Sequence, residues 1–507
     1  MVQLVVPMSG SGNRFKQAGY SKLKPLIEVD GKTYIEHVIN MFPNIDETLF
    51  IINKDEPQRD DLIRVLRKLK PESKIAEIDQ HKNGPSWAIS KASEYINEDD
   101  KVIVSYCDFK AIWSFEEMVN QLDLFDASVL TYTGFHPHML RSTKFAYVKK
   151  DSEDVVEIQE KNSYTDNPMS EEASAGVYGF KSGSVLLDAI KYQIENKIEF
   201  NGEFYTSLTV RAVLEMNLRV GTVLGSHFCQ WGTPHDLEDW QHFVSATRVA
   251  LAKPINKVEE VIPGVCLILA AGRGSRLANV SGVSKPNIPI GDKRLWDYSL
   301  DIALRHKTRA VATRNEVGLV SNNASSIDFV ILDNITEGQA HTAEILLDAI
   351  DDTATGPVTF LSTDNLIEPS YAKRSYDRVL KCDLLIWTCK RYPSAEIRPE
   401  QYSWVNVDSQ NQVLGTNMKS RPLDFVQSQM IIGNFTFRSR DLAKSLIKAL
   451  RVQSITVNGE YYLDSVIDIA LQLKLRVEAM EVENFMAIGN QIEYDTFKYY
   501  STGLKND

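Results

Sequence analysis

Two glycine-rich segments contain the residue types that can handle a phosphate group. Residues 10–15 read GSGNRF and residues 272–277 read GRGSRL, and each segment follows an apolar run. Glycine lets the backbone approach a ligand closely, so that successive N–H groups can point at an anion. A helix that follows such a loop adds its positive N-terminal end. Both segments therefore predict binding of a polyphosphate, although a glycine–serine loop can also be a plain turn.

Neither segment matches the two best-known phosphate-binding motifs. A Walker A loop requires G-x-x-x-x-G-K-[ST], which neither segment contains. The dinucleotide fingerprint G-x-G-x-x-G requires a third glycine, where this sequence has Phe15 and Leu277. Both segments share G-x-G-x-R instead, and a Lys-Pro pair follows at Lys24 and at Lys285.

The arginine and lysine of this shared pattern suit the transfer of a nucleotidyl group. Arg14 and Arg276 can bind the β- and γ-phosphates bidentately and stabilise pyrophosphate as it leaves. Lys24 and Lys285 can reach the α-phosphate, where negative charge builds up in the transition state. The proline after each lysine favours an extended lysine backbone. We therefore expect these four residues to be catalytic.

The two segments belong to a duplication of the whole chain. Six blocks recur in the same order, each offset by 254 to 262 residues. In the first copy these blocks are residues 3–15, 24–27, 83–85, 105–108, 176–180 and 201–205. Because the offset is nearly constant, we expect two domains, residues 1–250 and 264–507. A linker with two prolines, residues 251–263, is expected to join them.

Strands and helices alternate along each copy. In the first copy apolar runs predict strands and amphipathic runs predict helices, namely strands at 4–7, 48–52 and 102–105 and helices at 34–41, 59–69 and 86–95. Strands separated by helices imply a mostly parallel sheet flanked by helices, an α/β doubly wound domain. The ligand crevice of such a sheet lies at the carboxyl ends of its strands.

An aspartate follows a buried strand at the same point of each copy. Asp108 comes after the apolar run 102–106, and Asp364 comes after the run 358–362. A carboxylate at a strand end is a natural ligand for Mg²⁺, which prefers oxygen donors. We therefore predict both aspartates as metal ligands and Mg²⁺ as the cofactor. An aspartate at this point can also cap the helix that follows.

Residues 269–277, LAAGRGSRL, resemble the signature loop of the sugar-nucleotidyltransferase family, which includes sugar-1-phosphate nucleotidylyltransferases and phosphocholine-type cytidylyltransferases. The first copy has Met8 and Ser9 where small alanines are usual, but it is similar to the family at 24–32 and 35–38. The resemblance covers nearly the whole chain, twice. It implies a Rossmann-like fold in each domain and a Mg²⁺-dependent attack of a substrate phosphate on the α-phosphate of an NTP, with release of pyrophosphate.

The resemblance also implies where the NTP binds. In the family a glycine segment closes over the base; it corresponds here to Gly84 and to residues 338–340, which read GQA. The first copy departs from the family form at Pro85 and Ser86. The expected nucleotide-binding residues are those of the glycine-rich loops and of these segments, namely Met8, Ser9, Gly10, Ser11, Gly12, Gly84, Ala270, Ala271, Gly272, Arg273, Gly274, Ser275, Gly338 and Gln339.

The acceptor side differs between the copies. Glu160 and Lys161 resemble the family's Glu-Lys pair that contacts an acceptor sugar or its phosphate, whereas the second copy has Met418 and Lys419. The segments NGEFY at 201–205 and NGEYY at 458–462 resemble an acceptor-side segment of the family. The expected acceptor-binding residues are Glu160, Lys161, Gly176, Glu203, Lys419 and Glu460.

One family residue is missing from both copies. Many relatives carry a second metal-binding aspartate shortly before a Gly-Thr near the end of the domain. Residues 230–234 read QWGTP and residues 487–490 read AIGN, with no acid at the expected place. Either Asp236 or another group replaces it in the first copy, or the metal is held by Asp108 and the phosphates.

Composition excludes several classes of protein. The 507 residues have a formal net charge of −12 and no Lys/Arg run that could form the basic face a nucleic acid requires. No apolar run reaches the roughly 18 residues of a membrane span. The five cysteines are scattered without metal-binding spacing, which indicates free thiols in a reducing compartment. We expect a cytoplasmic protein that binds neither nucleic acid nor membrane; a homo-oligomer is compatible with the sequence.

The leading hypothesis is a bifunctional nucleotidylyltransferase that transfers NMP from an NTP to a sugar phosphate or a similar phosphorylated small molecule, for activated precursors of surface polysaccharide. One alternative is a single catalytic domain with a degenerate regulatory copy, and another is a nucleotide-sensing protein without turnover. A glycosyltransferase that uses nucleotide sugars is a further alternative, but its usual D-x-D motif is missing after the strands that precede Asp108 and Asp364. The sequence identifies neither the base nor the acceptor.

Overall fold

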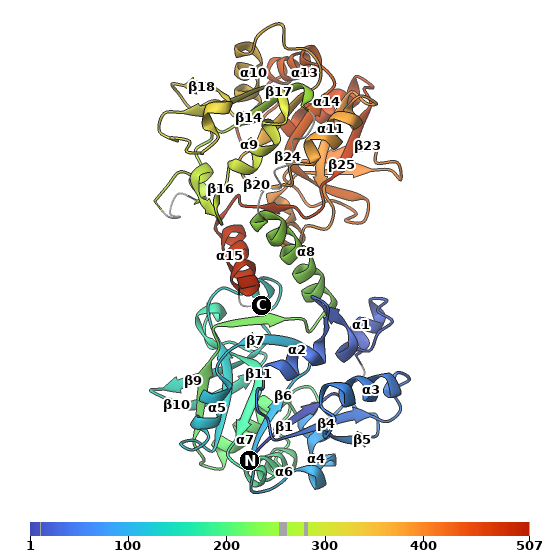
Figure 1. The fold of residues 1–507 in the computed structure, drawn as a ribbon, viewed down its shortest axis with the longest axis vertical. Helices are drawn as coiled ribbons and strands as arrows, with labels where there is room; N and C mark the ends of the chain where they lie inside the picture. Colours follow the sequence, from blue (N-terminus) through green and yellow to red (C-terminus); the bar gives the residue numbers. More distant parts are fainter. Residues whose placement is uncertain (11, 253–260, 278–281, 506–507) are drawn as a thin grey trace. The chain divides into compact units, whose positions relative to one another are not determined.

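The computed structural model describes residues 1–10, 12–252, 261–277 and 282–505. Within them the chain forms two units, mainly Met1–Gln241 and His242–Leu504, which we call the first and the second domain (Figure 1). The division falls inside the helix α8 (Pro234–Leu251). Most of the predicted linker, residues 253–260, and the predicted nucleotide-binding residue Ser11 lie outside the described residues.

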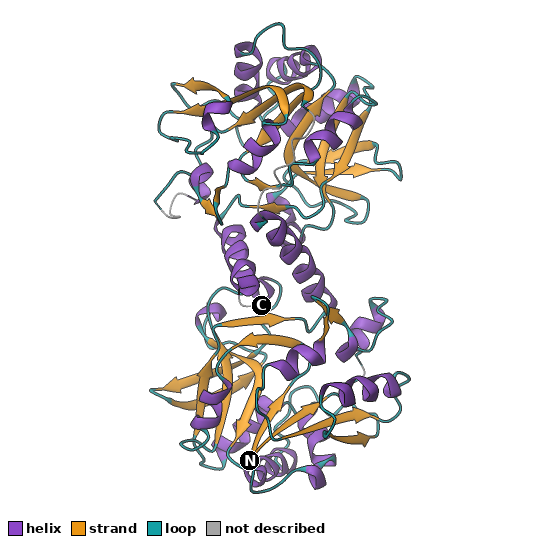
Figure 2. Cartoon of the chain, viewed as in Figure 1, coloured by secondary structure: helices purple, strands orange, loops and turns teal. Residues whose placement is uncertain are grey.

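The first domain is built on a mixed sheet of nine described strands (Figures 1 and 2). The strands are β1 (Val2–Pro7), β4 (Glu47–Asn53), β5 (Lys74–Ile78), β6 (Lys101–Ser105), β8 (Ala127–Tyr132), β9 (Ala146–Asp151), β10 (Asp154–Glu160), β11 (Glu172–Phe180) and β12 (Val220–Leu224). Their order is β10-β9-β11-β6-β1-β4-β5, with β8 pairing β11 and β12 pairing β8. The pairs among β6, β1, β4 and β5 are parallel, whereas β11 runs antiparallel to its neighbours.

Helices flank this sheet, and two short two-stranded sheets complete the described part of the domain. The helices are α1 (Asn13–Gln17), α2 (Tyr34–Asn40), α3 (Arg59–Leu69), α4 (Pro85–Lys91), α5 (Phe115–Gln121), α6 (Gly183–Glu195), α7 (Thr206–Glu215) and α8. The short strands are β2 (Glu28–Val29) with β3 (Lys32–Thr33), and β7 (Phe109–Ile112) with β13 (His227–Gln230).

The apolar sequence of β1 explains its central place. Leu4, Val5 and Val6 are all fully buried, as expected for a parallel strand that is covered on both faces. Because successive side chains point to opposite faces, Leu4 and Val6 pack into one hydrophobic cluster and Val5 into another. The two clusters are the two halves of the core, above and below the sheet.

The second domain repeats this topology strand for strand. Its strands are β14 (Ile262–Leu269), β17 (His306–Arg314), β18 (Asp328–Leu332), β19 (Val358–Ser362), β21 (Leu384–Cys389), β22 (Trp404–Val407), β23 (Val413–Asn417), β24 (Ser428–Phe437) and β25 (Val477–Glu481). The order is β18-β17-β14-β19-β24-β21-β25, with β22 and β23 added at β24. The parallel pairs of β14 with β17 and β19 match those of β1 with β4 and β6.

The helices of the second domain follow the first in part, because the described residues between β17 and β18 form the 3₁₀ turn Ala324–Ser326 where the first domain has α3. They are α9 (Asp297–Ala303), α10 (Gln339–Ala349), α11 (Tyr371–Val379), α12 (Pro393–Ile397), α13 (Arg440–Val452), α14 (Val466–Gln472) and α15 (Gln491–Lys505). The short strands are β15 (Pro289–Ile290) with β16 (Lys293–Arg294), and β20 (Asn365–Leu366) with β26 (Met486–Ala487).

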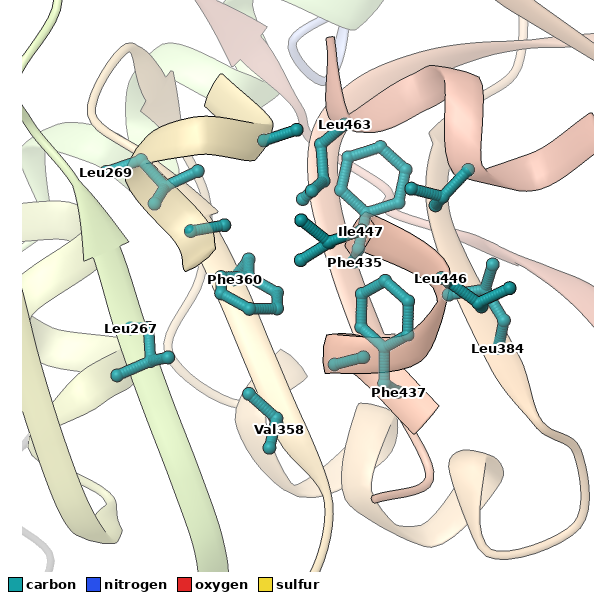
Figure 3. Close-up of a cluster of buried hydrophobic side chains, with 14 of the residues drawn as sticks. Leu267, Leu269, Val358, Phe360, Leu384, Phe435, Phe437, Leu446, Ile447 and Leu463 are labelled. Atoms are coloured by element: carbon teal, nitrogen blue, oxygen red, sulfur yellow. The ribbon is translucent and has the colours of Figure 1, made fainter. Parts of the chain in front are cut away.

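Aromatic and aliphatic side chains fill the space between the second sheet and its helices (Figure 3). Phe360 on β19 and Phe437 on β24 meet edge to face, with ring centroids 5.7 Å apart. Leu446 and Ile447 of α13 pack into the same cluster and are almost fully buried. This packing holds β19 in place, and with it the aspartate that follows the strand.

The predicted fold class, two tandem Rossmann-like α/β domains with helices on the sheets, is confirmed, as is the helix predicted at 59–69. The helix predicted at 86–95 ends earlier, because α4 stops at Lys91 and a 3₁₀ turn follows at Ser93–Tyr95. The helix expected after each glycine-rich loop is short: α1 has five residues, and the second loop leads into the 3₁₀ turn Ser275–Leu277.

None of the helices in the described ranges combines the length and the apolar character needed to cross a membrane. The five cysteines all lie in those ranges, and they form no disulfide there.

Candidate active site

The second glycine of each loop passes close to the Lys-Pro segment. Gly12 and Gly274 both have positive φ, 61° and 63°, a conformation that glycine adopts without strain. A Cβ on Gly274 would lie 3.0 Å from the Cβ of Lys285, and one on Gly12 would lie 3.8 Å from the Cβ of Lys24. The loop backbone therefore runs directly beside the lysine in both domains. The side chain of Ser275 lies outside the described residues.

A lysine–aspartate ion pair lies at the same point of each domain. Lys24 Nζ is 2.5 Å from Asp108 Oδ2, and Lys285 Nζ is 2.8 Å from Asp364 Oδ2. Lys24 Nζ also donates to Gly232 O at 3.2 Å. Each aspartate directly follows its strand, so the carboxyl end of β6 or β19 meets the Lys-Pro segment. The structure thus brings together two residues that the sequence predicted separately.

Each pair holds one partner in its charged form. Burial lowers the pKa of Lys24, but the Asp108 carboxylate and the nearby Cys107 raise it, so that the pKa ends above its ordinary value. Burial raises the pKa of Asp364, but the Lys285 ammonium opposes it and the net pKa falls to about 2. The surroundings therefore favour the charged forms of Lys24 and Asp364.

The loop arginines lie near the ion pairs and remain exposed. The Arg14 charge acts on Lys24, and the Arg276 charge acts on Asp364. Both guanidinium-bearing residues are exposed to solvent. An exposed arginine beside a glycine-rich loop can contact a phosphate group without first breaking a buried ion pair. Their placement fits the role predicted for them, which remains a prediction.

The predicted base-side and acceptor-side segments meet through backbone hydrogen bonds. Phe204 N donates to Asn83 O at 2.8 Å, and Ser86 N donates to Phe204 O at 3.0 Å. A Cβ on Gly84, whose φ is 89°, would come within 2.7 Å of the Phe204 backbone. Only glycine allows this approach, so Gly84 has a structural role whether or not it also contacts a nucleotide.

The second domain has the same contact. Tyr461 N donates to Glu337 O at 2.9 Å, and Ala340 N donates to Tyr461 O at 3.0 Å. A Cβ on Gly338, with φ 131°, would lie 2.6 Å from Tyr461 O. The predicted residue Gln339 is the first residue of α10, directly after this glycine.

Each acceptor-side segment begins with a tight Asn-Gly turn. Asn201 and Gly202 have φ of 53° and 80°, and Asn458 and Gly459 have φ of 51° and 80°. Two residues of positive φ are the signature of the hairpin turn that Asn-Gly favours. The predicted residues that follow, Glu203 and Glu460, close the turns by bridging to Phe200 and Val457. Glu203 is half-buried, whereas Glu460 is exposed.

The Glu-Lys pair of the first domain is an ion pair between a buried glutamate and a partly exposed lysine. Lys161 Nζ lies 2.7 Å from Glu160 Oε1, and Ser207 Oγ donates to Glu160 Oε2. Lys161 has a φ of 63°, uncommon for a residue with a side chain, and its ammonium lies 4.8 Å from the centroid of the Tyr205 ring. The pair therefore sits against the acceptor-side segment. Gly176, with φ 86°, lies nearby against the Tyr106 ring.

The second domain keeps the lysine of this pair in the same backbone conformation. Lys419 has a φ of 46°, its ammonium lies 5.5 Å from the Tyr462 ring, and its Nζ donates to Gln401 O at 3.1 Å. Met418, which replaces the glutamate, packs against the hydrophobic core. At the position of Ser207 this domain has the buried Asp464. The buried acidic residues of the two acceptor sides therefore stand at different positions of the repeat, Glu160 in the first domain and Asp464 in the second.

Two acids near the ion pairs, the partly buried Asp236 and the buried Glu493, cap the helices α8 and α15. Thr233 N donates to Asp236 Oδ2 at 2.9 Å, and Asp236 N donates to Thr233 Oγ1 at 3.2 Å, the reciprocal bonds of a capping box. Gly489 N donates to Glu493 Oε2 at 2.6 Å, and Glu493 N donates to Asn490 Oδ1 at 3.0 Å.

Asp236 was considered from the sequence, but Glu493 was missed. The offset of 257 residues that relates Glu203 to Glu460 also relates these two acids and would have revealed the second. Burial raises the pKa of Asp236 to about 6, helped by the negative charge of Asp108, and burial likewise raises the pKa of Glu493. Both acids therefore take up protons more readily than an exposed acid.

The donor set for a metal is one aspartate in each domain. In the described ranges no group of three or more histidine, cysteine, aspartate or glutamate residues could hold a metal ion. Asp108 and Asp364 use Oδ2 for their lysines. A hard carboxylate at a strand end suits a divalent cation that takes its other ligands from phosphate oxygens and water. The residues therefore fit a cation that arrives with the nucleotide better than one held by the protein alone.

Comparison with known proteins places the chain in a family. The family model described as "Nucleotidyl transferase" matches residues 5–246 and, separately, residues 265–481. The bifunctional protein GlmU of Clostridioides difficile (strain 630) is 25% identical over 232 residues, which cover 44% of this chain and 46% of that protein. The GlmU of Methanococcus maripaludis is 22% identical over 255 residues, or 50% of this chain and 56% of that protein. The matches thus span about half the length of these relatives.

Among solved structures, the nucleoside-diphosphate-sugar pyrophosphorylase of Vibrio cholerae RC9 is similar to this chain at 19% identity. The match has a TM-score of 0.39 and covers 46% of this chain and 98% of that one. The inositol-1-phosphate CTP transferase of T. maritima has 14% identity and a TM-score of 0.37, and the match covers 46% of this chain and 90% of that one.

The family model matches most of both domains, including each glycine-rich loop, each Lys-Pro segment and each strand-end aspartate. The family resemblance predicted from residues 269–277 is confirmed. The chain therefore belongs to the nucleotidyl transferase family, whose model it matches twice in tandem.

Proposed function

We propose that the protein is a bifunctional nucleotidylyltransferase, with one reaction in each domain. Each domain transfers NMP from an NTP to a sugar phosphate or a similar phosphorylated small molecule and releases pyrophosphate. The observation that carries this proposal is the repeated ion pair of Lys24 with Asp108 and of Lys285 with Asp364 beside a glycine-rich loop. The products would serve as activated precursors of surface polysaccharide, made in the cytoplasm where NTPs are available.

The residues support a direct displacement at the α-phosphate. An oxygen of the acceptor phosphate forms a bond to the α-phosphorus, the bond from that phosphorus to the β-bridging oxygen breaks, and pyrophosphate leaves. The exposed Arg14 and Arg276 would bind the leaving group bidentately. Lys24 and Lys285 lie where they can stabilise charge on the α-phosphate. When bound, Mg²⁺, held by Asp108 or Asp364, would neutralise phosphate charge and act as a Lewis acid.

Different acceptors for the two domains follow from their different acceptor sides. Glu160 and Lys161 offer a paired acid and base in the first domain. In the second domain Met418 removes the acid, while Lys419 retains the positive charge. A carboxylate can accept hydrogen bonds from sugar hydroxyls, whereas a lysine alone favours a phosphate or another anion. We therefore expect the two domains to prefer different acceptors.

The test is a matrix of substrates with pyrophosphate release as the signal. The full-length chain is incubated with each NTP, Mg²⁺ and a panel of sugar phosphates and other phosphorylated metabolites. Asp108→Asn and Asp364→Asn variants then assign each activity to a domain. Two activities, each abolished by only one variant, would support the proposal. Silence across the panel, with no binding of any NTP by calorimetry, would overturn it.

A second candidate is one catalytic domain with a regulatory copy. The observation that favours it is the loss of the buried acid at Met418, because acceptor binding can be lost while NTP binding remains. In that case Asp108→Asn removes all turnover, and Asp364→Asn leaves turnover in place but changes its dependence on NTP concentration. The same substrate matrix therefore separates the two candidates.

A further inference from the structure

Different side chains form hydrogen bonds with the glycine-rich loops of the two domains. In the first domain Ser9 Oγ lies 2.8 Å from His81 Nε2, which joins the loop after β1 to the segment after β5. In the second domain Ala271 stands at the position of Ser9. There Arg314 donates from Nε to Ala271 O at 2.9 Å and from Nη2 to Gly272 O at 3.3 Å. The serine–histidine contact therefore belongs to the first domain, because an alanine cannot form it.

A backbone N–H sets the protonation of the His81 ring. Asn83 N donates to His81 Nδ1 at 3.2 Å, so Nδ1 presents its lone pair and the neutral ring carries its proton on Nε2. Nε2 then donates to Ser9 Oγ, which directs the hydroxyl proton of Ser9 away from the histidine. Burial lowers the pKa of His81, which favours this neutral form. Ser9 is thereby held as a hydrogen-bond donor with a restricted direction.

This contact lies on the β5 side of the crevice, and Glu160 lies at the other side of the sheet. Parallel strands run in the order β6-β1-β4-β5, so their carboxyl ends meet at one edge of the sheet. Asp108 follows β6, Ser9 follows β1 and His81 follows β5 at that edge. Glu160 ends β10, on the opposite side of β6. A triphosphate held at the glycine-rich loop therefore has the β5 side, and His81, available for its base.

Aromatic rings line the same side in the first domain. The His81 ring centroid lies 4.5 Å from that of Trp87 on α4, and Lys91 Nζ lies 4.9 Å from the Trp87 ring. His81 and Trp87 are both half-buried, so part of each ring faces solvent. Aromatic faces of this kind can stack a nucleobase.

The second domain is built differently at these positions. Ile335 replaces His81 and is 45% exposed, and His341 replaces Trp87. His341 Nδ1 accepts a hydrogen bond of 3.2 Å from Glu337 N, the counterpart of Asn83 N. The equivalent backbone N–H therefore donates to an imidazole in both domains. In the first domain the acceptor is His81, which follows β5, and in the second it is His341 on α10. The two base-side surfaces therefore offer different hydrogen-bonding groups.

We propose that His81 is a positioning residue for nucleobase recognition in the first domain, where it orients Ser9 and packs against Trp87, and that it sets the NTP preference of this domain independently of the second. This role rests on the proposed function, because it needs an NTP in the first domain. If the contact between Ser9 and His81 only stabilised the loop, replacing His81 would weaken the binding of all four NTPs equally. Base recognition predicts instead a change in their rank order.

The experiment measures NTP affinities of the full-length chain by calorimetry in two backgrounds. Arg276→Ala weakens NTP binding by the second domain and so reports on the first; Arg14→Ala does the reverse. In each background ATP, CTP, GTP and UTP are titrated with Mg²⁺ into His81→Phe, which keeps a ring beside Trp87 but loses both hydrogen bonds, and into Ser9→Ala. Ile335→Ala, at the equivalent position of the second domain, is the matched control. Thermal unfolding shows that each variant is folded.

We expect both His81→Phe and Ser9→Ala to reduce the preference of the first domain for its best NTP over the next by about tenfold, the effect of one hydrogen bond. The second domain, measured in Arg14→Ala, should keep its rank order. An equal loss of affinity for all four NTPs, or no change in affinity, would overturn the inference while leaving the proposed function in place. If the unsubstituted chain binds no NTP at all, the proposed function fails, and this role of His81 fails with it.

Discussion

The Lys24 ammonium lies 2.5 Å from the Asp108 carboxylate, although 84 positions separate the two residues in the chain. The contact joins the Lys-Pro segment to the end of β6, and an equivalent contact joins Lys285 to Asp364. A lysine held in this way has a defined position before any substrate binds. Catalysis that depends on preorganised charge therefore needs both members of the pair.

Replacing Asp108 by asparagine should reduce turnover in the first domain by about a hundredfold, because Lys24 loses its anchor and a bound cation loses its ligand. It should also lower the free energy of unfolding by about 1–3 kcal/mol, since the partly buried ammonium loses a charged partner. The matched control is Asp123→Asn. Its carboxylate also pairs with a lysine, Lys101, at 2.6 Å, but the aspartate side chain is 68% exposed. That change should cost less than about 0.5 kcal/mol in urea unfolding. Equal losses for the two variants would contradict the expectation.

Alanine at Gly84 should destabilise the first domain by about 2–4 kcal/mol, because its Cβ would collide with the Phe204 backbone and φ is positive. Gly202→Ala separates the two causes. Gly202 also has positive φ, 80°, but a Cβ there would meet no described atom within 4 Å. It should cost only about 1 kcal/mol, the strain alone. Denaturant titration of both variants checks the difference, and a Gly84 variant as stable as the Gly202 variant would exclude the collision.

Acid should destabilise the first domain through its buried histidines. Burial lowers the pKa of His136 and of His227 to about 4, below the roughly 6.5 of an unfolded chain. Between these pH values the unfolded chain binds more protons, so stability is complete above about pH 6.5 and falls as pH drops toward 4. Each histidine should account for a few kcal/mol across this window.

The measurement for this prediction is urea unfolding at several pH values. His136→Phe should flatten the pH dependence of unfolding. His235→Asn should leave it unchanged, because the His235 side chain is 62% exposed. If the free energy of unfolding of His136→Phe depended on pH as steeply as that of the unsubstituted protein, other groups would be responsible for the loss of stability in acid.

Glycine at Lys161 should separate binding of the acceptor from binding of the nucleotide. Lys161 has a φ of 63°, which glycine adopts readily, so the backbone should keep its shape while the ammonium beside Glu160 is lost. The KM for the acceptor should rise by about tenfold or more, with NTP affinity unchanged. Lys197→Gly, at an exposed lysine with a φ of 52°, applies the same backbone change away from the site. Equal effects of the two changes on the acceptor KM would argue against a binding role for Lys161.

Periodic patterns predicted the fold well, whereas contacts between distant segments were harder to foresee. The helix at 59–69 was found at its predicted residues because its apolar positions repeat at helical spacing on one face. The end of α4 was missed because a helical pattern of side chains does not show where α-helix gives way to a 3₁₀ turn.

The repeat located the lysines and aspartates of the site, because both copies retain them at nearly equal offsets. The contact between Ser9 and His81 spans 72 positions and has no counterpart in the second copy. No internal comparison could have revealed it. The Gly-Thr motif does not point to Glu493, because residues 489–490 read Gly-Asn. Only the offset of 257 residues between the copies relates Glu493 to Asp236.

The hydrogen bonds between residues 83–86 and Phe204 are made by main-chain atoms alone, as are those of Tyr461. Side chains on both partners could therefore diverge after duplication, as Pro85 and Gln339 have, without breaking the connection. The same connection joins the predicted base-side segment of each domain to its predicted acceptor-side segment. We therefore expect a nucleotide that moves one segment to move the other, so that the first substrate to bind alters the shape that the second one meets.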